Sequence, residues 1–194
     1  MARKCKFTIN GKRYKTMNPI AKLSKVITDK KLWEGTIELQ RNDFLKRENT
    51  IDTNVYFIKN GSLRIFVLDD NNEHTIRFGY TNNIITALDS FFSETPSDLI
   101  VQALKATTVH YISKKQFLNF IFKDEEYTAL WNSLLSGLIL QQMERERDLL
   151  TSSPIERYKR VLKRSPVIFQ EIPHKYIASY LRMTPETLSR LKKS

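Results

Sequence analysis

The sequence predicts an α+β protein in which an antiparallel β-roll comes first, a long helix follows, and a helix-turn-helix ends the chain. Three observations predict this: short alternating runs with turn signals between residues 35 and 112, an apolar stripe along residues 126–150, and two short amphipathic segments between 173 and 193. Short strands at this spacing are typical of a sandwich or a barrel-like roll. We therefore expect a roll with a basic N-terminal extension over 1–125, a long helix over 126–150, and a helix-turn-helix domain over 151–194.

The composition is that of a globular protein that lies in the cytoplasm. Of the 194 residues, 41% are hydrophobic and 11% aromatic, which is too apolar for a disordered chain. The densest apolar run, Leu134–Leu140, contains Ser136 and Gly137 and is too short for a membrane span, and the basic N-terminus lacks the apolar core of a signal peptide. A single cysteine, Cys5, excludes an internal disulfide and an iron–sulfur cluster.

The net charge of +11 lies at the two ends of the chain. Residues 1–28 carry eight Lys or Arg and no acid, and residues 151–194 carry ten against three acids, so the middle is acidic. Two basic ends indicate a polyanionic partner, with nucleic acid as the leading candidate. A basic tail that serves only solubility is the alternative.

The first elements are less sharply specified than those that follow. Asn10-Gly11 between alternating residues is typical of a hairpin, although a disordered basic arm fits the same residues. From Pro19 to Leu32, apolar residues recur at helical spacing, which predicts a short amphipathic helix.

Turn signals punctuate the expected roll. Asn60-Gly61, between Val55–Lys59 and Ser62–Leu68, predicts a two-residue β-hairpin, because both turn positions favour a positive φ. Asp69–Glu73 predicts a second turn, which leads into a strand over His74–Tyr80. Three more strands are expected at Ile84–Leu88, Leu99–Leu104 and Thr108–Ile112, and a helix at Lys114–Phe122.

The long helix has an apolar stripe wider than one packing partner needs. Its members are Tyr127, Trp131, Leu134, Leu135, Leu138 and Met143. We expect one side to lie on the roll and the other to meet the same helix of a second subunit, which gives a two-fold homodimer. The alternative is a stripe that packs only within its own chain.

Small polar residues from Thr151 to Pro154 mark the boundary of the C-terminal part. The helix after them, Ile155–Leu162, has an apolar side formed by Ile155, Tyr158, Val161 and Leu162. Its outer side is expected to be basic, with Arg157, Lys159, Arg160, Lys163 and Arg164.

The stretch from Pro173 to Lys193 predicts two short helices joined by a tight turn. The first covers His174–Leu181; the second begins at Thr184, whose hydroxyl can cap it, and at Pro185, which suits the first helical position. Leu188 and Leu191 face inward, so Pro185, Glu186, Ser189 and Arg190 point outward. Such a face suits the major groove of DNA, where Arg can bind guanine and Glu can accept from cytosine. An ordinary helical hairpin with a surface Glu–Arg pair is the alternative.

The motif Thr184–Arg190, TPETLSR, resembles the recognition-helix pattern of the Crp/Fnr family of bacterial transcription regulators, and Tyr56–Phe66 resembles a hairpin of that family's roll. The resemblance covers about residues 18–193. It implies a cyclic-nucleotide-binding-like jelly roll and a winged helix-turn-helix that binds near-palindromic double-stranded DNA as a homodimer, with RNA polymerase as a further partner. It also implies the role of each motif residue: Glu186 and Arg190 read bases, Ser189 lies at the base edge or backbone, and Thr184 and Thr187 bind phosphates.

The chain departs from the family pattern in three places. Arg182 stands in the turn where the family often has Gly, and the sequence ends at Ser194, so we expect a truncated or absent wing with its contacts moved to the basic surface around 157–164. Asp89 and Ser90 replace a Gly-Glu pair, and Pro96 stands where the family's phosphate-binding Arg would be, followed by Ser97 and Asp98. This argues against cAMP or cGMP and leaves Asp89, Ser90 and Ser97 as candidates for another ligand.

Two other functions are open on the sequence alone. A ligand-binding or partner-docking module without sequence-specific DNA binding would also use the roll and the basic ends. An enzyme is disfavoured, because the sequence has no glycine-rich phosphate loop and no metal-ligand cluster, and its three histidines lie far apart. Haem is not excluded, but His74 and His110 fall in expected strands and are expected to face solvent.

Overall fold

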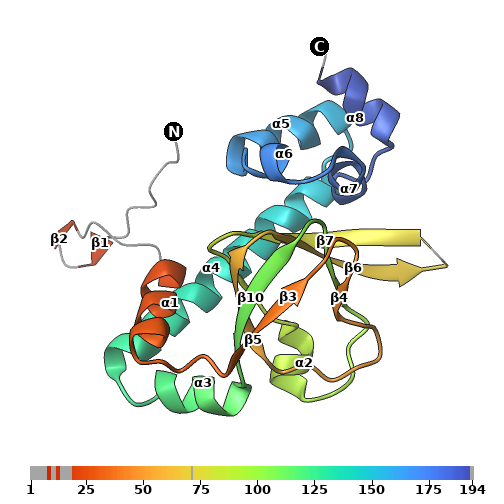
Figure 1. The fold of residues 1–194 in the computed structure, drawn as a ribbon. Helices are drawn as coiled ribbons and strands as arrows, with labels where there is room; N and C mark the ends of the chain where they lie inside the picture. The colour runs from red at the N-terminus through yellow and green to blue at the C-terminus, as the bar shows by residue number, and fades with distance from the viewer. Residues whose placement is uncertain (1–7, 10–11, 14–18, 71, 193–194) are drawn as a thin grey trace.

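The computed structural model describes residues 8–9, 12–13, 19–70 and 72–192. Its helices are α1 (Pro19–Asp29), α2 (Leu88–Ser93), α3 (Lys114–Ile121), α4 (Glu125–Leu150), α5 (Pro154–Arg164), α6 (Ile168–Glu171), α7 (His174–Tyr180) and α8 (Pro185–Leu191). Its strands are β1 (Thr8–Ile9), β2 (Lys12–Arg13), β3 (Gly35–Leu39), β4 (Phe44–Lys46), β5 (Val55–Asn60), β6 (Ser62–Asp69), β7 (Asn72–Tyr80), β8 (Ile84–Ile85), β9 (Ile100–Ala103) and β10 (Thr107–Ile112). The α+β class and the order of roll, long helix and C-terminal helices are confirmed (Figure 1).

Two four-stranded antiparallel sheets form the roll. One has the strand order β3-β10-β5-β8 and the other β4-β9-β6-β7. Between them lies a core that includes Ile58, Leu63, Ala103 and Val109, all completely buried. The short strands β1 and β2 pair antiparallel with each other, as expected for a hairpin at Asn10-Gly11. The turn at residues 10–11 lies outside the described residues.

The predicted hairpin at Asn60-Gly61 is wrong. Strand β5 pairs with β10 and β8, whereas β6 pairs with β7 and β9, so the chain crosses from one sheet to the other at this point. Gly61 has φ +103°, and a Cβ there would lie 2.6 Å from the Cα of Thr107. The glycine is needed for a sharp corner beside β10, and not for a two-residue turn. The turn predicted at Asp69–Glu73 is confirmed, because β6 and β7 pair antiparallel up to Asp69 and Asn72.

Helices α1, α3 and α4 pack together at one end of the roll (Figure 1). Leu23 and Ile27 of α1 are completely buried, which confirms the amphipathic helix expected there. Trp131 of α4 meets the rings of Phe91 and Phe117 at 6.1 and 5.1 Å between centroids. This aromatic cluster anchors the first half of α4 on the roll.

The apolar residues of α4 fall into a buried group and an exposed group. Trp131 and Leu134 are buried against the roll, while Ile139 and Met143 are 62% and 47% exposed, and Leu150 is 80% exposed. These last three residues follow one another at i, i+4 and i+11, so they lie along one side of the helix. Five of the six predicted stripe residues therefore pack within the chain, whereas Met143 is exposed in a row with Ile139 and Leu150, which the prediction did not include.

The C-terminal helices follow a short hinge from Thr151 to Ser153. Ser153 caps α5 by accepting from the N–H of Glu156, and Pro154 takes the first helical position. Val161 is buried as expected, but Leu162 is exposed, which corrects the predicted inner face. Helix α6, which the sequence did not predict, buries Ile168 beneath α7 and α8.

A buried carboxylate joins α4 to α5. Asp148, which is completely buried, accepts hydrogen bonds from the Nε of Arg160 at 3.0 Å and from the Nη2 of Arg164. Glu144, one turn earlier, accepts from the Nη2 of Arg160 at 3.2 Å. The hinge is thus spanned by two carboxylates of one helix and two guanidinium groups of the next.

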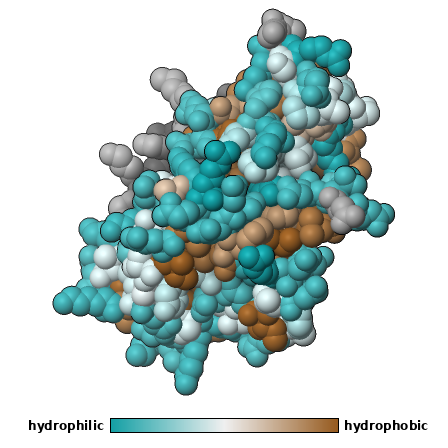
Figure 2. All heavy atoms as spheres, turned by 45° about the vertical axis from the view of Figure 1, so that its right-hand side comes forward, coloured by the Kyte–Doolittle hydropathy of each residue, from teal (hydrophilic) through white to brown (hydrophobic). Residues whose placement is uncertain are grey.

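No helix in the described part of the chain is long and apolar enough to cross a membrane. On the face drawn in Figure 2, apolar side chains gather in a band across the middle of the molecule, between the roll below and the C-terminal helices above.

Replacing Asp148 with Asn tests how much this joint stabilises the protein. The substitution keeps the size of the side chain but leaves two partly buried arginines short of a counter-charge, and removing one member of such a group costs about 3 kcal/mol. We expect urea denaturation to show a fall of about that size in the free energy of unfolding. Glu146→Gln, at an exposed position of the same helix, should change it by less than about 0.5 kcal/mol. Equal effects of the two substitutions would contradict the role of Asp148.

Candidate nucleic-acid interface and ligand sites

Helix α8 carries the motif TPETLSR on a short helix with a fixed start. The Oγ1 of Thr184 accepts from the N–H of Thr187 at 3.2 Å, and Pro185 follows at the first helical position. Leu188 is completely buried against the neighbouring helices. The cap and the buried leucine together set which side of α8 faces outward.

The predicted contact residues lie together on that outward side. Thr184, Pro185, Glu186, Ser189 and Arg190 are exposed, and Thr187 is half-buried, with its hydroxyl 3.1 Å from that of Thr184. Hydrogen bonds from its own backbone N–H and from Thr184 lower the pKa of Glu186. The carboxylate is therefore ionised at neutral pH and can act as an acceptor.

The turn between α7 and α8 holds Arg182 at φ +50°. Its N–H donates to the carbonyl of Ser179 at 3.1 Å, and the next N–H, of Met183, donates to the carbonyl of Ala178 at 3.1 Å. These bonds close the end of α7 with a left-handed residue, a conformation that a non-glycine residue adopts at a cost of about 1 kcal/mol.

The basic outer surface predicted for α5 is only partly present. Arg157 donates to the carbonyls of Leu181 at 3.0 Å and of Thr151 at 2.6 Å, so it ties the hinge to the end of α7. Arg160 and Arg164 are held by Asp148. Lys159 and Lys163 remain exposed on this helix, so three of the five basic residues support the structure.

The predicted ligand residues lie around α2, and the hydroxyl groups of two of them already form hydrogen bonds within the protein. The Oγ of Ser90 donates to the carbonyl of Thr95 at 2.9 Å and accepts from the N–H of Asp52 at 3.0 Å. The Oγ of Ser97 accepts from the N–H of Leu99 at 3.1 Å, and this side chain is buried. Asp89 is exposed, and its carboxylate accepts from the N–H of Ser90.

Lys46, which sequence reasoning missed, is buried beside this region. Its ammonium group donates to the carbonyls of Arg47, Ser97 and Leu99 at 2.8 to 3.1 Å. Burial lowers the pKa of Lys46, while Asp89, Asp52 and Asp98 act in the opposite direction. All three N–H donors of the ammonium group bind carbonyls of the protein itself. The sequence did not indicate this, because nothing around Lys46 in its short strand distinguishes it from a surface lysine.

The two histidines expected to face solvent are both partly exposed on strands. The Nε2 of His74 lies 3.7 Å from Asp69, and the Nδ1 of His110 lies 2.9 Å from the hydroxyl of Thr36. Within the described residues, no group of three or more His, Cys, Asp or Glu side chains could hold a metal ion.

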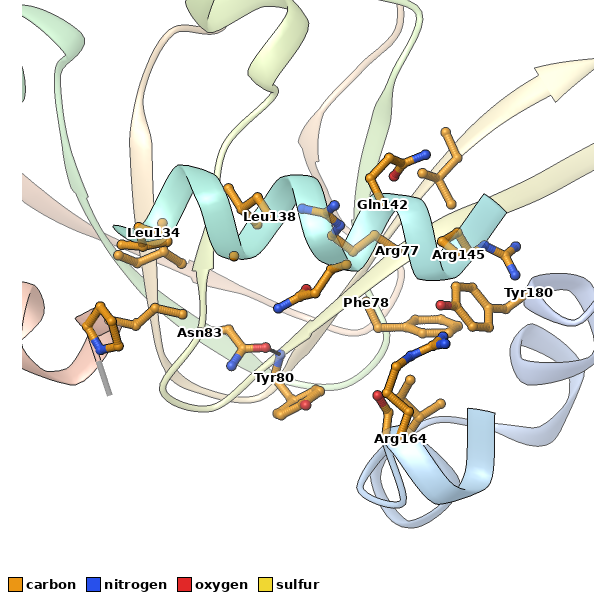
Figure 3. Close-up of a pocket in the computed structure, with 18 of the residues that line it drawn as sticks. Arg77, Phe78, Tyr80, Asn83, Leu134, Leu138, Gln142, Arg145, Arg164 and Tyr180 are labelled. Carbon is orange, nitrogen blue, oxygen red and sulfur yellow. Dashed lines mark hydrogen bonds between the residues drawn. The ribbon is translucent and has the colours of Figure 1, made fainter. Parts of the chain in front are cut away.

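A cavity of about 450 Å³ lies between the roll, α4 and the C-terminal helices (Figure 3). Arg77, Phe78 and Tyr80 of β7 form one wall, Leu134 and Arg145 of α4 another, and the C-terminal part contributes a third, which includes Arg164 and Tyr180. Sequence reasoning missed this site, because its residues come from three separate parts of the chain.

Comparison with known proteins identifies the architecture. Residues 36–124 match the family model of the cyclic nucleotide-binding domain. CooA from Carboxydothermus hydrogenoformans is 17% identical with a TM-score of 0.68, over 87% of this chain and 81% of that one. FixK2 from Bradyrhizobium japonicum is 17% identical with a TM-score of 0.69, over 82% of both chains. The chain has the Crp/Fnr fold.

The same Crp/Fnr fold is seen in CLP, a c-di-GMP responsive global regulator from Xanthomonas campestris. It is 14% identical with a TM-score of 0.65, over 88% of this chain and 90% of that one. No curated protein matches the chain by sequence. At these identities the likeness establishes the fold, and the roles of individual residues depend on the geometry described above.

Arg182→Gly tests the strain in the turn of this Crp/Fnr fold. Glycine adopts a positive φ at little cost, so we expect the substitution to raise the free energy of unfolding by about 0.5–1 kcal/mol in urea denaturation. Arg182→Ala, which keeps the Cβ, is the matched control and should give no gain. A gain for alanine equal to that for glycine would show that the charge, and not the backbone, is responsible.

Proposed function

We propose that the protein is a DNA-binding transcription regulator that binds a near-palindromic site as a homodimer. The observation that carries this proposal is the outward face of α8, where Glu186, Ser189 and Arg190 are exposed while Leu188 is buried beneath them. In a major groove, Arg190 would bind guanine and Glu186 would accept from cytosine, with Ser189 beside them. Thr184 and Thr187, at the start of the helix, would bind phosphates and set its register.

The similarity to CLP, a global regulator of gene expression, supports a regulator over an enzyme. The basic C-terminal part supplies the sequence-independent attraction to DNA that such a protein needs. RNA polymerase is the further partner that we infer for a regulator of this fold. A ligand-binding or partner-docking module without specific DNA binding is the second candidate, and the two exposed lysines of α5 would suit it as well.

We propose further that the α2 region does not bind cAMP. Residues 86–98 contain no arginine, the hydroxyls of Ser90 and Ser97 already have partners, and the ammonium of Lys46 is saturated by carbonyls. A cyclic phosphate would therefore find no arginine in this segment and no free donor on Lys46, and Asp89 and Asp98 would repel it.

An exposed apolar row on α4 supports the dimer. Ile139, Met143 and Leu150 form a row that lies away from the roll, and a second copy of α4 would bury it in a two-fold arrangement. The exposed surface of three large apolar side chains on one side of a helix is otherwise left in water.

Arg190→Ala tests the readout of DNA. After selection of the best site from a random pool, we expect the substitution to weaken binding by about 1–3 kcal/mol and to relax the preference at one base pair of each half-site. Arg41→Ala, which removes an exposed arginine of the roll, should leave the affinity unchanged. Adding cAMP should change neither affinity.

A selection that enriches no sequence would favour the second candidate. Equal affinity of Arg190→Ala and the parent protein for the best site, across salt concentrations, would remove Arg190 from the readout.

Ile139→Glu tests the dimer. A carboxylate at the start of the apolar row would be buried without a partner in a dimer, so we expect sedimentation velocity to show a monomer at micromolar concentration. Ala129→Glu, at an exposed position nearer the start of α4, is the control and should remain dimeric. A parent protein that sediments as a monomer would contradict the dimer directly.

A further inference from the structure

The cavity between the roll, α4 and the C-terminal helices is positively charged. Three arginines line it, one from each part: Arg77 of β7, Arg145 of α4 and Arg164 of α5. No Asp or Glu is among the described residues of its walls. Figure 3 shows these side chains on the elements that surround the space. Its volume of about 450 Å³ falls within the range of small-molecule pockets.

Only one of these arginines is neutralised. Arg164 donates to the buried carboxylate of Asp148. Arg77 and Arg145 form no ion pair with any described residue, although each is at least half-buried. Burial lowers the pKa of Arg77 and of Arg145, yet a guanidinium group remains protonated in proteins. Neither of these charged groups therefore has an ion-pair partner within the described residues, and Asp148 acts on Arg145 only from beyond ion-pair distance.

Arg145 is the more deeply buried of the two and gives the stronger evidence for a bound anion. It is only 7% exposed, and its Nη1 is buried without a hydrogen-bond partner in the described chain. Its Nη2 reaches the carbonyl of Thr75 at 3.5 Å, which is a long hydrogen bond, and its Cζ lies 3.7 Å from the centre of the Tyr180 ring. The ring stabilises the cation, but it does not satisfy the N–H groups, and an unsatisfied buried charge is costly.

The rest of the cavity is neutral and mixed in polarity. Amide groups of Asn83, Gln141 and Gln142 supply hydrogen-bonding groups, and Phe78, Leu134 and Leu138 supply apolar surface. A ligand that suits these walls has an anionic group for the arginines and an apolar body for the remainder. This site is separate from the α2 region, whose hydroxyl and ammonium groups already have partners.

We propose that this cavity binds a small organic anion, with its phosphate or carboxylate group held by Arg77 and Arg145 and its apolar body against Phe78 and the α4 leucines. Guanidinium groups bind both kinds of oxyanion through paired N–H groups. Because the walls come from β7, α4 and the C-terminal helices, the bound anion would touch all three parts at once. The site does not depend on the proposed DNA binding, and its test uses no DNA.

Phenyl phosphate is the probe, titrated into the full chain by calorimetry and followed by thermal unfolding. We expect saturable binding with a rise in the unfolding temperature, because a ligand that binds only the folded state stabilises it. Benzyl alcohol, which has the ring without the charge, should give neither effect. Benzoate in place of phenyl phosphate identifies whether the site prefers carboxylate or phosphate, and tighter binding of either one supports the proposal.

Arg145→Gln and Arg77→Gln should each weaken binding of the probe at least about tenfold, since each removes a charged bidentate donor. Arg41→Gln, which removes an arginine outside the cavity, should leave the affinity unchanged. Arg77 is only half-buried, so Arg77→Gln is expected to disturb folding less. If Arg145→Gln does not fold, the affinity of the Arg77 variant tests the anion site. Absence of binding by both anions, or equal binding by the parent and the folded Arg77 variant, would overturn the proposal.

Discussion

The contact of Asp148 with Arg160 and Arg164 determines how the two parts of the molecule are joined. A completely buried carboxylate requires compensation for its lost hydration, and the two guanidinium groups of α5 supply it. This places α5 against the end of α4. Helix α7 then lies on β7, where the hydroxyl of Ser179 donates to the carbonyl of Glu73 at 3.0 Å and the ring of Tyr180 lies 5.4 Å from that of Phe78. The outward face of α8 follows from that placement, because Leu188 packs into the same cluster.

Different stretches of helix α4 contact the roll, contact α5 and face solvent. Trp131 and Leu134 fix its first half to the roll, and Glu144 and Asp148 bind α5. Ile139 and Met143 remain exposed between them. This outer row is an apolar surface of α4 that its own chain leaves uncovered. Dimer formation and the position of the C-terminal helices would then share one rigid element.

Two regions of the roll differ in whether their polar groups already have partners. Around α2, the hydroxyls of Ser90 and Ser97 and the ammonium of Lys46 are bound by the protein itself, so a ligand would gain little there. In the cavity beside α4, the Nη1 of Arg145 has no partner in the described chain. Arginines without an ion pair, Arg77 and Arg145, lie where the roll, the long helix and the C-terminal helices meet, and that is where an anion would gain most.

The sequence by itself determined the local elements of this protein. The cap at Thr184 and Pro185, the extent of α4 and the strands β5, β6, β7, β9 and β10 depend on neighbouring residues, and spacing and capping chemistry predicted them. The strands β3 and β4 were not predicted individually, and the strand expected over Ile84–Leu88 ends at Ile85, before helix α2. The tertiary structure decided what depends on distant partners. Asn60-Gly61 has the local signature of a hairpin, but β5 and β6 belong to different sheets. Arg160 and Arg164 looked like solvent-facing residues of a basic helix until Asp148, on another helix, proved to be buried beside them. Arg77, Arg145 and Arg164 line one cavity only because β7, α4 and α5 pack together. The spacing of residues within one segment cannot predict which distant segments come into contact.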